Sequence, residues 1–474
     1  MRFTYLLNLS GLLVLLGSAL SPTHAGGLNT RQLSVQALAN APDLICPTTP
    51  AKPKKPKPSP QADAPEGPLG IPEPQEVLQA LAEADLPGMV SPASKQSLPA
   101  WSAVAANQTF RVAFWGDSHL AAGFFTQELG RRAGLEPDQV HSAFVGATLT
   151  RAGVRLPVRK ACASAEWRHE SAHAVPAAAQ APGPALVNQF ASKADASLAW
   201  DLRNAQRMPV HHSLRFLFQQ TDSPIRIAIR VDGSAEQELQ LDGSAGPAAL
   251  DLQADAPLST LHLRLLAGSL RSHGLALPVA SSARLQLDLF ALPGATVRGW
   301  QYANLDYLRR WFADAPPYQL VALAYGTNEG NEKPFDAAAY TQTLRQSVTQ
   351  LRQVFPQVAC MLIGPGDRGL LVPRQRPAKT TAKKPKPAVN LLKYSSIHTQ
   401  ITRIQHTVGT ELGCQTWSMM QAMGGKASSY AWARQRPALM AHDLIHFTVP
   451  GYQRLAQTFA DDMGWTPQTL WLAP

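Results

Sequence analysis

Four polar residues in three short motifs could together perform nucleophilic catalysis on an ester. Ser118 lies in the motif GDSH, Asn328 lies in GTNE, and Asp443 and His446 lie in DLIH. A serine hydroxyl becomes a strong nucleophile when a base removes its proton, and a histidine oriented by a carboxylate is such a base. The short spacing lets Asp443 orient His446 from within one turn. The side chain of Asn328 could donate a hydrogen bond to the oxyanion that forms during the attack.

These motifs fall where an open α/β sheet presents its ligand site. GDSH follows the apolar run 110–115, GTNE follows the apolar run 320–325, and DLIH precedes a helix that VPG opens at 449–451. Ligands bind at the carboxyl ends of the strands in such sheets, so we expect the motifs to meet at one edge. Each motif alone occurs often by chance, and their order along the chain carries the prediction. The surrounding strand, turn and helix pattern predicts a doubly wound, flavodoxin-like α/β domain.

Changes in composition and in hydrophobic pattern along the chain predict its domain organisation. Residues 155–287 contain short alternating runs such as IRIAIRVDG, separated by Gly, Ser, Asp and Pro, which is typical of a β-sandwich-like module. We expect this module to interrupt the α/β domain, whose two parts would be 109–154 and 288–474. Residues 26–108 have the composition of a linker or extension, with one helix near 75–84.

The first residues predict export. Residues 1–25 contain one basic residue, an apolar stretch and small residues before a plausible cleavage point, as in a secretory signal peptide. The stretch is shorter than a membrane span needs, and no later run of 18 apolar residues exists. We therefore expect an exported, periplasmic protein of the bacterial cell envelope, without stable membrane insertion once the signal is cleaved.

Export makes the four cysteines candidates for disulfides. Cys360 and Cys414 each open an apolar run after a helix-like segment, and they could bond if these runs are neighbouring parallel strands. Cys46 and Cys162 would then pair by elimination. Buried free thiols are the alternative, and the sequence leaves the connectivity open.

The net charge of +10 has a local origin. Residues 51–60 and 372–388 carry four and six Lys or Arg and no acidic residue, and the rest of the chain is formally neutral. A nucleic-acid-binding protein normally carries its basic residues on a folded face with aromatic or groove-reading residues among them. We therefore expect no nucleic-acid function, and we expect 372–388 to be a disordered Pro/Lys loop.

Taken together, the motifs resemble those of the SGNH (GDSL-type) hydrolases. The block-one serine, block-three asparagine and block-five Asp-x-x-His of that family match Ser118, Asn328, Asp443 and His446 in sequence order. The tract AMGGKASSYAW at 422–432 and the β-rich insertion add a resemblance to bacterial peptidoglycan O-acetylesterases, which are exported SGNH enzymes with an inserted carbohydrate-binding-like module. The usual lipase motif G-x-S-x-G is absent, which argues against an ordinary α/β-hydrolase.

Two positions of the resemblance need comment. The block-two glycine is best matched by Gly294, in LFALPGATV, and Gly146, in HSAFVGATL, has nearly the same local pattern and is the alternative. Block three has Glu329 where aspartate is usual, at a position that mostly supports the turn.

The resemblance implies a serine esterase that removes O-acetyl groups from a cell-envelope polysaccharide, most simply peptidoglycan. Ser118 would attack the acetyl carbonyl, with His446 as base and Asp443 orienting it. The backbone N–H groups of Ser118 and Gly294 and the amide of Asn328 would form the oxyanion hole. No cofactor and no metal are implied. Two alternatives stay open: a polysaccharide O-acetyltransferase with the same site, and a non-catalytic polysaccharide-binding envelope protein.

A competing motif is HESAH at 169–173, which matches the zinc-binding pattern H-E-x-x-H. Such a site needs a helix, and Pro176 would cut that helix short. We therefore expect the match of HESAH to the zinc-binding pattern to be a coincidence.

Other residues near the site or in the module have two possible roles. His119, beside the nucleophile, could line a pocket or face solvent. Trp167, Trp200 and Trp300 could stack on sugars, but core positions are the commoner use of tryptophan.

Overall fold

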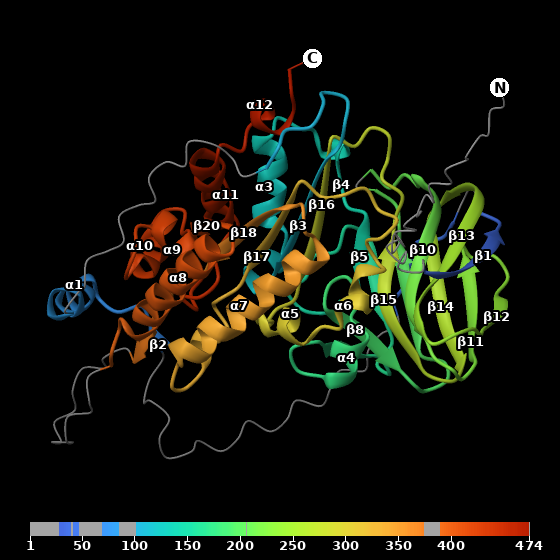
Figure 1. Cartoon of the computed structure of the whole chain (residues 1–474), viewed down its shortest axis with the longest axis horizontal. Helices are drawn as coiled ribbons and strands as arrows, with labels where there is room; N and C mark the ends of the chain where they lie inside the picture. Colours follow the sequence, from blue (N-terminus) through green and yellow to red (C-terminus); the bar gives the residue numbers. More distant parts are fainter. Residues whose placement is uncertain are drawn as a thin grey trace, which may run out of the picture.

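The computed structural model describes most of the 474-residue chain, namely residues 28–38, 41–46, 69–84, 101–204, 206–373 and 389–473. The expected signal peptide at 1–25, the tract 51–60 and residues 374–388 of the expected Pro/Lys loop lie outside the described residues. An α/β domain and a β module lie side by side, with the module on the right in Figure 1.

The centre of the α/β domain is a six-stranded parallel sheet in the order β20-β18-β17-β3-β16-β4. In chain order its strands are β3 (Phe110–Gly116), β4 (Val140–His141), β16 (Leu285–Ala291), β17 (Leu320–Ala324), β18 (Ala359–Gly364) and β20 (Gln415–Ser418). Alternate residues of β3 enter two separate cores, Val112 and Phe114 on one face and Ala113 and Trp115 on the other. Because both faces are covered, the strands are apolar throughout, as the sequence indicated.

Helices cover both faces of this sheet. One core takes side chains from α1 (Pro74–Glu83), α2 (Ser118–Ala121), α3 (Phe124–Arg132), α9 (Met419–Met423), α10 (Ser428–Arg434), α11 (Val449–Met463) and α12 (Pro467–Leu470). The other core takes side chains from α4 (Pro176–Gln180), α5 (Arg298–Tyr302), α6 (Leu305–Arg309), α7 (Ala337–Val354) and α8 (Lys393–Glu411). Two 3₁₀ turns, η1 (Pro137–Gln139) and η2 (Glu329–Asn331), lie in the connections. The predicted doubly wound α/β domain is confirmed.

The module consists of two sheets packed face to face. One has the order β1-β13-β10-β15-β8-β7, with β5 also paired to β15; its strands are β1 (Asn29–Val35), β5 (Phe144–Gly146), β7 (Arg168–Ser171), β8 (Val187–Ala191), β10 (His211–Gln220), β13 (Gly246–Leu258) and β15 (Leu270–Ala276). The other has the order β12-β11-β14-β9-β6; its strands are β6 (Lys160–Ala163), β9 (Ser197–Asp201), β11 (Ile225–Val231), β12 (Gln237–Leu241) and β14 (Thr260–Ala267). A third core with Trp167, Trp200 and Phe216 lies between them. The predicted β-sandwich-like insertion is confirmed.

The module uses more of the chain than 155–287. Strand β1 comes from the segment that we expected to be linker, and it pairs in parallel with β13. Strand β5 comes from 144–146, whereas β16, which begins at 285, belongs to the parallel sheet. These differences arise because pairing with a distant strand leaves little trace in a short, mostly exposed segment such as β1.

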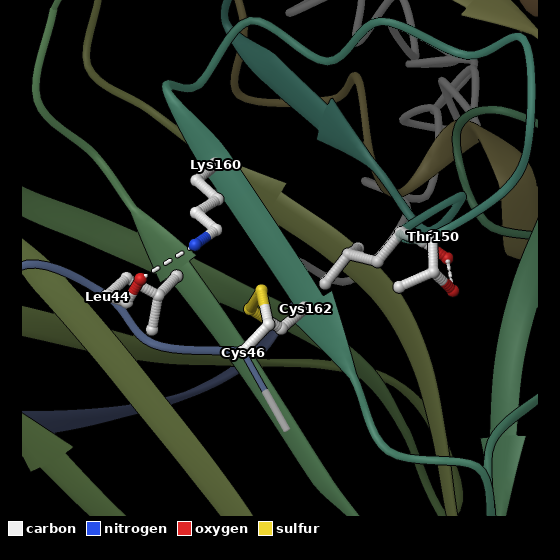
Figure 2. The surroundings of a disulfide bond; sticks show 6 residues. Leu44, Cys46, Thr150, Lys160 and Cys162 are labelled. Atoms are coloured by element: carbon white, nitrogen blue, oxygen red, sulfur yellow. Dashed lines mark hydrogen bonds between the residues drawn. A yellow bond between two sulfur atoms is a disulfide. The ribbon is translucent and has the colours of Figure 1, made fainter. Parts of the chain in front are cut away.

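The first disulfide fastens the N-terminal segment to the module (Figure 2). Cys46 is bonded to Cys162 of β6, across 116 residues of sequence. Beside it the ammonium group of Lys160 donates a hydrogen bond of 2.9 Å to the carbonyl oxygen of Leu44. The segment that carries β1 is therefore held at both ends, by sheet pairing and by a covalent bond.

The second disulfide joins Cys360 of β18 to Cys414, the residue before β20. These two strands are parallel neighbours, which is the condition that the sequence set for this pairing. The two bonds account for all four cysteines, and no free thiol remains.

A small two-stranded sheet lies where the Pro/Lys loop was expected to begin. Val372–Pro373 form β19, which pairs antiparallel with β2 (Leu69–Gly70) just before α1. This pairing orders the first two residues of the expected loop 372–388.

None of the helices in the described ranges has the length and apolar content needed to cross a bilayer.

Candidate active site

Three side chains from two distant parts of the chain form a hydrogen-bonded relay at the carboxyl edge of the parallel sheet. The Oγ of Ser118 lies 3.0 Å from Nε2 of His446, and Nδ1 of His446 lies 2.7 Å from Oδ2 of Asp443. Both separations are within normal hydrogen-bond range. With Nδ1–H donating to the carboxylate, Nε2 is free to accept the hydroxyl proton of Ser118.

Ser118 owes its position to a tight turn between β3 and α2. Gly116 ends β3, and a Cβ at this position would lie 2.9 Å from the carbonyl oxygen of Ala324 on the neighbouring strand, so glycine is needed for the close approach. Asp117 caps α2, and its carboxylate accepts a hydrogen bond of 2.9 Å from the N–H of His119. Ser118 is therefore the first residue of the helix, directly above the strand end.

Asp443 and His446 are held by a loop that folds back on itself before α11. The Oδ1 atom of Asp443 accepts hydrogen bonds of 3.0 Å from the backbone N–H groups of Ile445 and His446. Burial raises the pKa of the Asp443 carboxyl, but the hydrogen bonds from His446 and Ile445 outweigh it and hold this pKa below its ordinary value. Asp443 is therefore ionised and can orient the imidazole.

Asn328 lies against the loop that contains Gly294, and the two residues follow β17 and β16, the strands on either side of β3. The Nδ2 group of Asn328 donates a hydrogen bond of 2.9 Å to the carbonyl oxygen of Ala295, the residue after Gly294. The N–H of Leu292 donates to the carbonyl oxygen of Gly116 at 3.1 Å, which fixes this loop against the end of β3. Gly294 has φ of +86° and open space where a Cβ would be.

The alternative glycine lies elsewhere. Gly146 ends β5 and pairs with Gly274 of β15, within the module's sheet. Of the two glycines that the sequence left open, Gly294 is the one beside Asn328.

Glu329 supports the turn after β17, as the sequence indicated, and its carboxylate also reaches a second loop. Its carboxylate accepts hydrogen bonds from the N–H of Val297 at 2.9 Å and from the N–H of Gly326 at 3.0 Å. It thereby ties the end of β17 to the loop that contains Gly294. Burial raises the pKa of this carboxyl to about 7, against the lowering effect of those two hydrogen bonds. The glutamate side chain, which is one methylene longer than that of aspartate, reaches the N–H groups of both Val297 and Gly326.

His119 lies inside the protein rather than in solvent. Its ring is buried, with centroids 5.6 Å from the ring of His446 and 5.1 Å from that of Phe447. Burial lowers its pKa to about 3, so the ring is neutral. The His119 ring therefore packs near the ring of His446, the proposed base.

The segment HESAH does not form the helix that a zinc site would need. Residues 168–171 form strand β7, and Glu170 pairs with Arg168 and Arg271. The described residues contain no group of three or more His, Cys, Asp or Glu side chains placed to hold a metal ion. Trp167, Trp200 and Trp300 are buried in the cores and are not available to stack on a sugar.

This chain is similar to known proteins in its structure. No protein-family model matches the sequence, and no curated protein matches it. A solved structure titled "Peptidoglycan O-acetylesterase in action, 5 min" is similar with a TM-score of 0.55 and 20% sequence identity, over 76% of this chain and 92% of that one. A putative GDSL-like lipase from Parabacteroides merdae matches with a TM-score of 0.27 and 13% identity, over 38% of this chain and 74% of that one.

The first of these matches covers three quarters of the chain, which is more than the expected α/β parts 109–154 and 288–474 contain. The order of the sheet, the strand-end position of Ser118 and the loop before α11 agree with the organisation that the sequence motifs indicated. The chain has the fold of the SGNH (GDSL-type) hydrolases.

Proposed function

We propose that this protein is an exported serine esterase that removes O-acetyl groups from a cell-envelope polysaccharide, with peptidoglycan as the substrate. The observation that carries the proposal is the relay from Asp443 through His446 to Ser118, with hydrogen bonds of 2.7 and 3.0 Å. A serine held in this way by a histidine and an ionised carboxylate is equipped for acyl transfer.

In the first half of the reaction, Oγ of Ser118 forms a bond to the acetyl carbonyl carbon while Nε2 of His446 takes the hydroxyl proton. The carbonyl oxygen becomes an oxyanion, which the N–H groups of Ser118 and Gly294 and the side-chain amide of Asn328 would stabilise. The bond between the acetyl carbon and the sugar oxygen then breaks, and His446 returns its proton to that oxygen. The products are a free sugar hydroxyl and acetyl-Ser118.

In the second half, His446 removes a proton from water as the water oxygen attacks the acetyl-enzyme. The bond to Oγ of Ser118 breaks, the proton passes back to that oxygen, and acetic acid leaves. Asp443 stays ionised throughout and stabilises the imidazolium that forms twice in each cycle.

Three observations support a polysaccharide as the substrate. The side chains of His446 and Asp443 are 43% and 46% exposed, so the site is open enough for a polymer to approach. A β sandwich is inserted in the catalytic chain. The similar structure of TM-score 0.55 is titled a peptidoglycan O-acetylesterase.

The proposal of export rests on other features. The two disulfides and the sequence of residues 1–25 agree with export to an oxidising compartment.

The test is acetate release from O-acetylated peptidoglycan and from acetylated xylan by the wild-type protein, Ser118→Ala and Ser244→Ala. Ser244 is an exposed serine of the module and serves as the matched control. We expect faster release from peptidoglycan, loss of nearly all release in Ser118→Ala, and labelling of wild type and Ser244→Ala, but not Ser118→Ala, by a fluorophosphonate.

Full activity in a folded Ser118→Ala protein would overturn the catalytic assignment. Faster release from xylan would overturn the choice of peptidoglycan. Transfer of acetyl groups to an added oligosaccharide in preference to water would identify an acetyltransferase instead.

A further inference from the structure

A polar groove lies on the module, on the face of its seven-stranded sheet that turns toward the α/β domain. Two adjoining cavities, of about 390 and 280 Å³, form this groove and share Arg215, Ala276 and Leu277. The outer cavity is also lined by Gln32, Ser213, Leu214, Asp251, Leu252, Gln253 and Pro278. The inner cavity reaches Arg111, Gln286, Arg310, Trp311 and Asp314 of the α/β domain.

The floor of the outer cavity is a flat platform of polar side chains. Gln32 of β1, Asp251 of β13 and Arg215 of β10 stand directly opposite one another on three paired strands. Two residues further along the strands, Gln253 and Ser213 form the next pair on the same face. With Ala276 on β15, the platform spans four strands, or about 14 Å at the usual strand spacing. That width suits two or three sugar rings.

The side chains of the platform are ready to bind a ligand. The guanidinium of Arg215 makes two hydrogen bonds to the carboxylate of Asp251, at 2.6 and 2.9 Å, so this pair is fixed and electrically neutral. Within the described part of the chain, the amides of Gln32 and Gln253 and the hydroxyl of Ser213 have no hydrogen-bond partner, although all three line the cavity. Leu277 and Pro278 add apolar surface next to them. Donors and acceptors beside an apolar wall match a sugar ring, which has hydroxyls at its edge and C–H groups on its faces.

The inner end of the groove is basic. Arg111 and Arg310 line it, with Asp314 as the single acidic group among the lining residues, while Arg215 is neutralised by Asp251. The outer end therefore suits uncharged hydroxyl groups, whereas the inner end suits a carboxylate.

The groove lies away from the catalytic edge. Arg111 and Gln286 stand near the amino-terminal ends of β3 and β16, whereas Ser118 and Gly294 follow the carboxyl ends of the same strands. Seven residues of strand separate the two edges by about 20 Å. A polymer in the groove is thus held apart from the ester that reacts.

We propose that this groove is a second polysaccharide site, which binds an acidic glycan segment whether or not it is acetylated. Neutral sugar hydroxyls contact Gln32, Ser213 and Gln253, and a carboxylate of the same segment lies near Arg310. The chemistry of the ligand follows the proposed substrate, but binding here does not depend on Ser118 being the nucleophile. The site keeps the enzyme on its polymer between one hydrolysis and the next.

The experiment uses the full-length Ser118→Ala protein and insoluble peptidoglycan that mild alkali has stripped of O-acetyl groups. Co-sedimentation gives the dissociation constant for this parent, for Gln32→Ala with Gln253→Ala, and for Gln237→Ala with Gln240→Ala. The last pair lies on β12, in the other sheet of the module, and is the matched control. We expect about tenfold weaker binding for the groove pair, the result of two lost hydrogen bonds, and no change for the control pair.

Two further measurements complete the test. One checks that the groove variants are folded, and the other checks whether Arg310 recognises the charge of the glycan. The groove pair in the wild-type background should hydrolyse a small acetyl ester at the normal rate. Arg310→Gln should weaken binding to the acidic polymer while leaving binding to neutral chitooligosaccharides unchanged.

Equal binding by the groove pair and the parent would overturn the proposal, as would no binding by the parent. Equal losses of binding and of small-ester hydrolysis would also overturn it, because the two glutamines would then be structural. None of these three results decides whether the protein is an esterase, because that proposal is tested by the activity of Ser118→Ala.

Discussion

The Oγ of Ser118 lies 3.0 Å from Nε2 of His446, the proposed base. Asp443 in turn orients the His446 ring through a hydrogen bond of 2.7 Å to Nδ1. Asn328 is the proposed oxyanion donor, and its amide is already oriented by the carbonyl oxygen of Ala295. An amide held in place before the reaction stabilises the oxyanion without any cost of reorganisation.

Removing that amide should slow the chemical step. We predict that Asn328→Ala lowers kcat on a small acetyl ester by roughly 10²–10³-fold with little change in KM, the usual cost of one lost oxyanion donor. Asn331→Ala is the control, since this exposed residue contacts Arg368 instead of the serine. Steady-state kinetics of both variants check the prediction, and a tenfold rise in KM with unchanged kcat would contradict it.

Asp117, the residue before the serine, should make stability depend on pH. Burial raises its pKa from 3.8 to about 6, against the opposing hydrogen bond from the N–H of His119. The folded protein therefore holds a proton between about pH 4 and 6 that the unfolded chain has lost. The free energy of unfolding falls as the pH rises through this range, by up to about 3 kcal/mol.

The variant Asp117→Asn has no titrating group here. We predict that its stability relative to wild type improves steadily from pH 4 to pH 7, as measured by urea denaturation at each pH. Parallel stability curves for the two proteins would show that Asp117 does not hold its proton in the folded state.

At the level of elements, the site depends on how strand ends and loops are joined. The loop at 292–297 is fastened to the end of β3 by Leu292 and to the end of β17 by Glu329. The serine and the proposed oxyanion donors thereby belong to one rigid unit at the carboxyl edge of the sheet.

Glu329→Gln should disturb this unit without touching the substrate. A glutamine can accept only one of the two backbone hydrogen bonds, and its NH₂ group faces the other donor. We predict a fall in kcat of about tenfold, equivalent to about 1.4 kcal/mol of activation energy, with KM nearly constant. Glu332→Gln, whose side chain pairs with Arg298 at the surface, is the control. Unchanged kcat in Glu329→Gln would mean that the loop keeps its position without this tie.

The disulfide between β18 and β20 should contribute to stability and not to chemistry. Closing a segment of 54 residues restricts the unfolded chain. We predict that Cys360→Ala with Cys414→Ala lowers the free energy of unfolding by about 2–4 kcal/mol, measured by denaturant titration, while small-ester hydrolysis by the folded protein is unchanged. Equal unfolding midpoints for the wild type and the double variant would contradict the prediction.

The sequence predicted these elements well where their patterns are local. Strand β3 and the turn at Ser118 are visible in one short run, and so is the Asp443–His446 pair. The bonds of Glu329 were not predictable, because one donor, Val297, lies 32 residues away. Strand β1 was missed because most of its side chains are exposed, so its sequence has no apolar alternation to mark it.

On the scale of the whole molecule, the described residues form three large hydrophobic cores and one small cluster around Leu44 and Cys162. Two of the large cores flank the parallel sheet, and the third fills the sandwich. Leu217 and Ala249 of the module belong to the same core as Trp115 and Phe290 of the sheet, so the two parts are packed into one body. The sequence predicted both architectures but not this shared core, since residues that meet there come from strands far apart in the chain.

The Pro/Lys tract should act through charge alone. Residues 374–388 carry six Lys or Arg and no acidic residue, and such charges attract carboxylates of an anionic polymer within about 8 Å at physiological salt. We predict that deletion of 374–388 leaves hydrolysis of a small neutral ester within twofold of wild type, and makes binding to peptidoglycan less sensitive to added salt. Co-sedimentation across a salt series measures this, and an unchanged salt dependence would reduce the tract to a spacer.

The Cys360–Cys414 bond also decides what a protease can do to this protein. The basic tract lies between the two cysteines, so it offers trypsin-like enzymes their preferred residues inside a closed covalent ring. A cut there would put Ser118 and Asn328 on one polypeptide and Asp443 and His446 on another. The disulfide would keep the two pieces as one molecule, with β18 and β20 still paired. In a compartment that keeps disulfides oxidised, a nicked chain would thus keep Ser118, Asn328, Asp443 and His446 in one covalently linked molecule, and reduction would remove that link.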